Sequence, residues 1–131
     1  MSNNVRYANY SARASLRKRI ASAPQRCWMC GLPIDPSLGR LHPYALELDE
    51  LVPVSKGGSP VDPANVRASH RCCNQWRGNK SVAAVRSAAE AAATVGRWMS
   101  PAEFVVFARS AGRGGPAVGR SGASVKPSRR W

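Results

Sequence analysis

Two residue pairs with the spacing of metal ligands constrain this fold more than any other feature of the chain. They are Cys27-x-x-Cys30 and His70-x-x-Cys73, and 39 residues separate them. Two ligands at this spacing can reach one tetrahedral ion from a tight turn, and Gly31 relieves the turn that carries the first pair. Three thiolates and one imidazole form a closed ligand set typical of structural zinc. The sequence therefore predicts that one Zn²⁺ joins the first pair to the start of a helix.

The same residues allow other interpretations. Cys72 could replace His70 in the ligand set, although adjacent cysteines rarely both face one ion. Alternatively, His70 acts as a catalytic base and the three cysteines hold zinc alone. A C-x-x-C pair also occurs in redox proteins. The N-terminus lacks the apolar core of a signal peptide, so we expect a cytoplasmic protein, whose reduced thiols favour metal binding over disulfides.

The charge of the chain predicts a polyanionic partner. The 131 residues carry a formal net charge of +13, and the pI is about 11.0. We expect the partner to be DNA and not a membrane, because no long apolar span or amphipathic lipid-facing stretch is present. A chain of this length forms one small domain with tails, and a metal ion would add to its limited core.

Hydrophobic spacing and turn residues predict a small α+β domain. In chain order we expect a basic helix at 11–21, an irregular loop at 32–44, a strand at 45–54, a turn-rich loop at 55–64, an antiparallel strand at 65–68, and helices at 81–95 and 100–112. Ser100, Pro101 and Glu103 have the pattern of a capping box, and Gly112 fits the end of that helix. Phe104, Phe107 and Ala108 would face the core.

The chain divides into three parts by composition. Residues 1–22 form a basic, partly helical segment, and residues 23–112 hold the central domain with its C-terminal helices. Residues 113–131 contain five basic residues and no acid, in a background of Gly, Ser and Pro. Such a segment cannot bury enough apolar surface to order itself, so we expect a disordered basic tail.

Three of the seven acidic residues lie within four positions, at Glu47, Asp49 and Glu50. In so basic a chain, this grouping suggests a place that holds a cation or moves a proton. Asp49 on a strand and Asn74 near a helix start offer oxygen ligands, which suit Mg²⁺ or Mn²⁺ better than zinc. Taken singly, each is better explained as a strand-end or helix-start residue. The prediction depends on their joint placement beside the two zinc pairs.

The segment from Cys27 to Lys80 resembles the HNH endonuclease family, particularly the small forms that tailed bacteriophages encode near terminase genes. The resemblance includes the two zinc pairs, Asp-Glu-Leu-Val-Pro at 49–53, Gly57-Gly58, Asn65, Cys73-Asn74 and Arg-Gly-Asn-Lys at 77–80. It covers less than half of the chain, but the combined pattern is specific. It implies a ββα-metal (HNH) fold, in which a β-hairpin and a helix hold one divalent ion and a zinc knuckle supports them.

The resemblance also implies roles for the matching residues. Asp49 and Asn74 would bind the catalytic Mg²⁺ or Mn²⁺ together with the scissile phosphate. Asn65 would hold the loop and orient the general base. The candidate nucleic-acid contacts are the basic residues in and beside the motif: Lys56, Arg71, Arg77 and Lys80.

The chain departs from the family at Glu50, which occupies the position of the histidine base. Histidine is well suited to accept a proton from water at neutral pH, whereas glutamate is ionised there but is a weaker base. Glu50 would activate water, serve as a third metal ligand, or mark a site with weakened catalysis. A glutamate beside Asp49 also adds negative charge where a phosphate must bind.

We therefore expect a metal-dependent DNA endonuclease or nickase, acting with a phage terminase in DNA packaging. The main alternative is a non-catalytic, zinc-stapled module that binds DNA or assembles with terminase and keeps a degenerate HNH site. A third interpretation, a regulator that binds DNA by charge alone, predicts no requirement for Asp49 or a divalent ion. Oligomeric state does not follow from the sequence.

Overall fold

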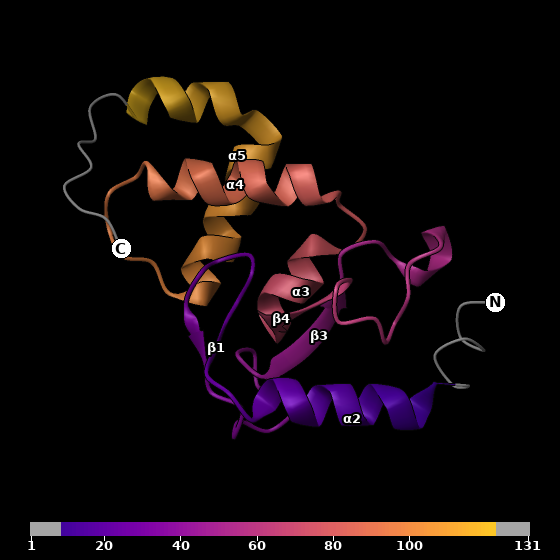
Figure 1. The fold of residues 1–131 in the computed structure, drawn as a ribbon. Helices are drawn as coiled ribbons and strands as arrows, with labels where there is room; N and C mark the ends of the chain where they lie inside the picture. Colours follow the sequence, from indigo (N-terminus) through magenta and orange to yellow (C-terminus); the bar gives the residue numbers. More distant parts are fainter. Residues whose placement is uncertain (1–8, 123–131) are drawn as a thin grey trace.

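An antiparallel hairpin lies between one N-terminal helix and a group of three helices in the computed structural model, which describes residues 9–122 (Figure 1). The hairpin consists of β3 (Leu46–Glu50) and β4 (Val66–His70), paired along their full length with Leu46 opposite His70. The chain passes directly from β4 into α3 (Arg71–Arg77), and α3 packs against both strands. The expected order of strand, strand and helix is confirmed, although β3 is shorter than the predicted strand and β4 extends two residues past Ala68.

The N-terminal helix α2 (Tyr10–Ala21) lies along the other side of the hairpin (Figure 1). Its Leu16 is buried against Leu48 of β3 and Val66 of β4, and Ile20 packs beside them. The remaining side chains of α2 are mostly exposed or partly exposed. This confirms the predicted basic helix.

A short strand pair frames the first cysteine pair. β1 (Gln25–Arg26) and β2 (Pro33–Ile34) are antiparallel, and the chain reverses between them. Gly31 has a φ of +80° in this turn, a conformation that glycine adopts without strain. The backbone N–H of Trp28 donates to the carbonyl of Ala68 at 3.1 Å, which attaches the turn to β4. β2 falls where we expected only irregular loop, because two residues are too few to give a strand pattern.

Two further helices pack behind α3. α4 (Val82–Ala93) begins after Ser81, whose Oγ accepts a hydrogen bond from the backbone N–H of Ala84 at 3.1 Å. α5 (Pro101–Gly122) begins with the predicted capping box: Glu103 N–H donates to Ser100 Oγ at 3.1 Å, and Ser100 N–H donates to the Glu103 carboxylate at 2.9 Å. Both predicted helix starts are confirmed.

The predicted end of the last helix at Gly112 is wrong, because α5 continues to Gly122. The boundary that we expected at residue 113, between the domain and its tail, therefore lies inside this helix. Adding residues to an existing helix costs less free energy than starting a new one. A single glycine is therefore a weak signal for where a helix ends. Residues 123–131 of the expected tail lie outside the described residues. None of the helices between residues 9 and 122 combines the length and apolar character needed to cross a membrane.

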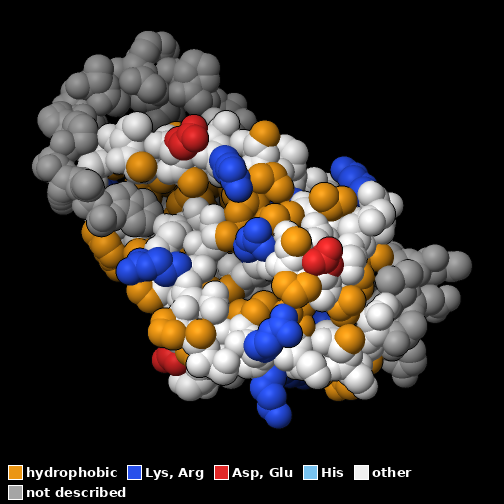
Figure 2. All heavy atoms as spheres, in the orientation of Figure 1, with side chains coloured by type: hydrophobic (Ala, Val, Ile, Leu, Met, Phe, Trp, Pro, Cys, Tyr) orange, Lys and Arg blue, Asp and Glu red, His pale blue; other side chains and the backbone are white. Residues whose placement is uncertain are grey.

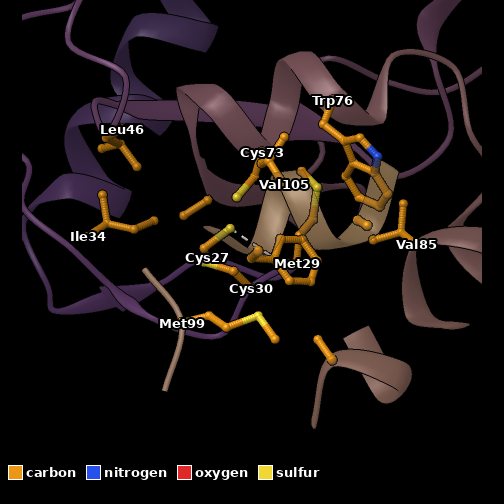
Figure 3. Packing of buried hydrophobic residues seen from close by; sticks show 14 residues of the cluster. Cys27, Met29, Cys30, Ile34, Leu46, Cys73, Trp76, Val85, Met99 and Val105 are labelled. Carbon is orange, nitrogen blue, oxygen red and sulfur yellow. Dashed lines mark hydrogen bonds between the residues drawn. The ribbon is translucent and has the colours of Figure 1, made fainter. Parts of the chain in front are cut away.

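The main core lies between α3, α4, α5 and the turn that carries Cys27 and Cys30, and Figure 3 shows its packing. Trp76 of α3 meets Phe104 of α5 edge to face, with ring centroids 5.6 Å apart. Phe104 and Ala108 are buried and Phe107 is partly buried, as predicted. The three cysteines of the predicted zinc site belong to the same cluster. The candidate metal site is therefore part of the core.

Candidate functional site

Cys27, Cys30, His70 and Cys73 form a buried group of four potential metal ligands. Their donor atoms all lie within 4.8 Å of one another. Ligands held about 2.0–2.3 Å from one tetrahedral ion would lie roughly 3.5–3.8 Å apart, so a small contraction would close this group on a metal. Figure 3 shows the sulfur atoms of Cys27 and Cys73 pointing toward each other. The predicted group is confirmed as a potential metal site, and its donors are consistent with structural zinc; Cys72 is not a member.

The orientation of His70 suits metal binding. Its Nδ1 lies 3.3 Å from Cys30 Sγ, and its Nε2 lies 3.0 Å from the carbonyl of Pro33. An imidazole that donates its Nε2–H to a backbone carbonyl keeps the Nδ1 lone pair for a metal. The side chain is also buried, with 2% of its surface exposed. These contacts disfavour the alternative in which His70 is a catalytic base.

The three thiols of the group are close enough to change each other's ionisation. Hydrogen bonding with Cys27 raises the pKa of Cys30 to about 12. Hydrogen bonds with Cys27 and Cys30 also raise the pKa of Cys73. Burial raises the pKa of Cys27, but hydrogen bonds with Cys30 and Cys73 outweigh it, so that the pKa of this thiol is lowered. The group alone thus favours a single thiolate, whereas a divalent cation would stabilise all three.

A second candidate site lies along the free edge of β3, between α2 and α3. A pocket of about 950 Å³ is lined there by Tyr10, Arg13, Ala14 and Arg17 of α2, by Glu47, Leu48, Asp49, Glu50 and Pro53, and by Asn74, Arg77 and Gly78. Because side chains alternate along a strand, Glu47 and Asp49 approach from the α3 face and Glu50 from the α2 face. The acidic cluster and Asn74, which the sequence singled out, therefore share one pocket. We name it the acidic pocket.

Asp49 is held by two donors on one of its oxygens. Oδ2 accepts hydrogen bonds from Trp28 Nε1 at 2.9 Å and from Arg77 Nη1 at 2.8 Å. Oδ1 has no hydrogen-bond partner among residues 9–111, whose side chains the structure describes. Burial raises the pKa of Asp49 and prevails over the opposing effects of Arg77 and Trp28. The carboxylate is thus fixed through one oxygen and leaves the other available.

Arg77 does not lie where we expected it. We expected a phosphate contact, but its side chain is 2% exposed. Besides Asp49, the guanidinium donates to the carbonyls of Glu50 at 2.8 Å, Leu51 at 2.7 Å and Lys80 at 2.9 Å. Protein acceptors therefore occupy Arg77, and we assign it to holding Asp49 and the end of β3.

Glu50 is paired with an arginine from outside the resembling segment. Its carboxylate lies 2.9 Å from Arg13 Nη1, and 7% of the residue is exposed. Arg13 also donates to the carbonyls of Pro60 at 2.7 Å and Leu48 at 3.4 Å. Arg17, one turn further along α2, donates to the carbonyl of Leu46 at 2.9 Å. The sequence predicts that this helix is basic, but no local pattern places it on β3.

Asn74 contacts the third acid of the pocket. Its Nδ2 donates to Glu47 Oε1 at 2.9 Å, which leaves its Oδ1 free of hydrogen bonds within the described chain. Arg71 Nη1 lies 3.4 Å from Glu47 Oε2. Arg71 and Glu47 each have 28% of their side chains exposed, so both are accessible from solvent. Glu47 had no role in the sequence prediction beyond its place in the acidic cluster.

Asn65 lies outside the acidic pocket and bridges the loop that follows β3. Its Oδ1 accepts from Val52 N–H at 2.9 Å, and its Nδ2 donates to the carbonyls of Val52 at 3.0 Å and Ser59 at 2.9 Å. Its backbone carbonyl accepts from Leu51 N–H at 2.8 Å. Asn65 therefore fixes the chain directly after Glu50.

The remaining candidate nucleic-acid contacts are exposed but lie outside the pocket. Lys56 ends a short 3₁₀ turn, η1 (Val54–Lys56). Lys80 Nζ donates to the carbonyl of Trp76 at 2.8 Å and lies 5.0 Å from the Trp76 ring centroid. On the face drawn in Figure 2, Lys and Arg side chains stand singly among apolar and backbone atoms. The positive charge is thus spread over this face.

Comparison of the chain with protein-family models, with curated proteins and with solved structures found no match. The functional interpretation therefore depends on the two sites themselves.

Proposed function

We propose that the chain is a metal-dependent DNA endonuclease or nickase in which the Cys/His group holds a structural Zn²⁺. The observation that carries the proposal is the convergence of Glu47, Asp49, Glu50 and Asn74 in one pocket. Glu47, Asp49 and Glu50 lie on β3, and Asn74 directly follows Cys73 of the Cys/His group in α3. Together with the motif resemblance, this arrangement supports an HNH-type site.

The donors in the acidic pocket fit a hard divalent cation. Asp49 Oδ1 and Asn74 Oδ1 both lack hydrogen-bond partners among the described residues, and both side chains line the pocket. Carboxylate and amide oxygens are ligands that Mg²⁺ and Mn²⁺ accept. When bound, such an ion would supply Lewis-acid stabilisation of the charge that develops on the phosphate and the leaving oxygen.

Glu50 is the proposed general base. It would take a proton from water as the water oxygen forms a bond to phosphorus and the bond from phosphorus to the 3′ oxygen breaks. The 3′ oxygen leaves in line with the attack and gains a proton from solvent, giving a 5′-phosphate and a 3′-hydroxyl. Arg13 would keep the Glu50 carboxylate directed at the pocket.

Binding of DNA is supported by charge. The chain carries a formal net charge of +13, and Arg13 and Arg17 line one wall of the acidic pocket. Exposed Lys56 and Lys80 and partly exposed Arg71 would add contacts to phosphates around it. Such contacts give affinity with little sequence preference. A role beside a phage terminase in packaging extends the family resemblance and is part of the proposal.

A non-catalytic DNA-binding or terminase-assembly module is the second candidate. It is favoured by the pairing of all three pocket acids with arginines: Glu47 with Arg71, Asp49 with Arg77, and Glu50 with Arg13. Such pairing neutralises the carboxylates without any metal ion. The substitution of glutamate for the family's histidine points the same way.

Nicking of supercoiled plasmid by the purified, zinc-loaded protein tests these alternatives. We expect the zinc-loaded protein to nick the plasmid when Mg²⁺ or Mn²⁺ is added and not to nick it when no further divalent ion is added. Glu50→Gln should abolish nicking, whereas Glu90→Gln, the same change on the exposed face of α4, should not. If the wild type only retards the plasmid with every metal while Glu50→His cuts it, the chain is a binding module. If Glu50→Gln cuts as well as wild type, the nuclease stands without Glu50 as its base.

A further inference from the structure

One residue connects the two candidate sites directly. Trp28 lies between the ligands Cys27 and Cys30, in the turn that would hold the zinc ion. Its indole Nε1 donates to Asp49 Oδ2 at 2.9 Å, across a separation of 21 residues in the chain. A side chain in the middle of the metal turn therefore ends on a carboxylate of the acidic pocket.

The Trp28 side chain is held from several directions. Its backbone N–H is bonded to Ala68 of β4 at 3.1 Å, and the guanidinium of Arg77 lies 5.3 Å from its ring centroid. Arg77 and Trp28 also share Asp49 Oδ2 as their acceptor. Because the three groups contact one another, a shift of the metal turn would move the indole and disturb both donors to Asp49.

The position of Asp49 matters because only one of its oxygens is held. With Oδ2 occupied by two donors, the carboxylate cannot turn without breaking its hydrogen bond to the charged Arg77 guanidinium. If the indole N–H were lost, Arg77 alone would hold the carboxylate, and rotation about its terminal bond would cost less. The indole therefore restricts the oxygen that the pocket would use.

We infer that Trp28 is a positioning residue that fixes Asp49 and thereby couples occupancy of the Cys/His metal group to the acidic pocket. The catalytic part of this inference rests on the proposed function, but the coupling itself does not. Coupling between two sites is reciprocal for equilibrium binding, so a change at Asp49 must alter the metal affinity of the Cys/His group if Trp28 transmits it.

Zinc affinity, measured by competition with a chromogenic chelator, tests the coupling without any cleavage assay. The proteins compared are wild type, Asp49→Asn, Trp28→Phe and the double variant. Phenylalanine keeps an aromatic ring in place and removes the N–H. We expect Asp49→Asn to change zinc affinity at least about fivefold in the wild-type background, the lower end of typical coupling, and to have little effect beside Trp28→Phe. Trp98→Phe, at an exposed tryptophan, is the matched control and should leave the effect of Asp49→Asn intact.

Two results would overturn the inference. One is that Asp49→Asn leaves the zinc affinity unchanged. The other is that Asp49→Asn changes the zinc affinity equally in the wild-type and Trp28→Phe backgrounds. In the plasmid assay, the kcat of zinc-loaded Trp28→Phe should fall roughly tenfold, which is the change in an equilibrium constant that the loss of one charge-assisted hydrogen bond produces. The KM for DNA should not change, and Trp98→Phe should behave as wild type. A kcat equal to that of Trp98→Phe would contradict the positioning role. If the wild type does not cut at all, the proposed function fails, and the affinity comparison alone decides the coupling.

Discussion

Replacing Cys73 by serine tests whether the Cys/His group holds a metal ion that the fold requires. Cys73 is fully buried in the main core and its Sγ is one of the four donors. Its neighbour Cys72 is half-buried and lies outside the group. Cys72→Ser is therefore a matched control, since it makes the same chemical change one residue away. We expect Cys73→Ser to lose zinc and stability, and Cys72→Ser to keep one zinc per chain.

The expected size of the effect follows from linkage. Structural zinc binds small domains with apparent free energies of roughly 10–16 kcal/mol at neutral pH, comparable to the whole stability of a domain. At a free zinc concentration about 1,000 times the Kd, zinc binding adds about 4 kcal/mol to the free energy of unfolding. If serine weakens binding so that free zinc no longer exceeds the Kd, the protein loses this stabilisation. For a domain near 100 residues, that loss lowers Tm by roughly 15 °C or more.

Thermal melting followed by circular dichroism measures this change, and a colorimetric zinc assay on the same samples gives the metal content. Cys73→Ser should melt far below Cys72→Ser and contain little zinc. Chelation of the wild type should bring its Tm close to that of Cys73→Ser. A zinc-free wild type with unchanged Tm would refute the structural role, and so would a Cys73→Ser protein that keeps its zinc and melts with the control.

Two further outcomes follow from the geometry. A Cβ at Gly58 would lie 1.7 Å from the carbonyl oxygen of Val52, so Gly58→Ala must move the loop, and we expect it to lower the free energy of unfolding in urea by roughly 2–4 kcal/mol. The control Gly57→Ala has open space around the new methyl group but a φ of +93°, and it should cost only about 1 kcal/mol. Equal losses in the two variants would contradict the packing argument. The raised pKa of Cys30, about 12, means that the metal-free thiol keeps its proton at neutral pH. Zinc must displace that proton, so apparent zinc affinity should rise with pH and protons should be released on loading, whereas a pH-independent affinity between pH 6 and 8 would contradict it.

The parts of the structure that sequence reasoning found are those with local signals. Cys27 and Cys30 reach one ion because of their spacing, and the capping box of α5 is complete within four residues. The hairpin and α3 follow from alternation, turn residues and the second ligand pair. Each of these signals acts over a few residues. It can therefore be interpreted without knowing which distant segments of the chain pack together.

The parts that sequence reasoning missed depend on contacts across the chain. Arg77 has the appearance of a surface cation in a basic motif, yet it is buried because Asp49 and the carbonyls of Glu50 and Leu51 satisfy its guanidinium. Arg13 and Arg17 belong to the predicted basic helix, for which the sequence indicates no destination. Their destination is the free edge of β3, whose carbonyls at Leu46 and Leu48 need donors once α2 covers them. No local pattern specifies which helix covers an unpaired strand edge.

The departure at Glu50 and the arginine outside the resembling segment are best understood together. A histidine at this buried position could remain neutral, whereas an ionised glutamate requires a compensating cation. Arg13, with 24% of its side chain exposed, lies 2.9 Å from the Glu50 carboxylate and fulfils that need. Substitution at one of these positions without the other should therefore be costly, and this coupling can be measured directly.

Arg13→Ala should destabilise the zinc-loaded protein by roughly 2–3 kcal/mol in urea unfolding, somewhat below the value for removing one partner of a fully buried pair. In a Glu50→Gln background, the same change should cost only about 1 kcal/mol, because position 50 then carries no negative charge for Arg13 to offset. Arg13→Lys should recover part of the loss, since an ammonium group keeps the charge but cannot reach Glu50, Pro60 and Leu48 together. If Arg13→Ala costs the same with glutamate as with glutamine at position 50, then Arg13 serves only as an anchor of α2. In that case the glutamate and the arginine are independent features of the chain.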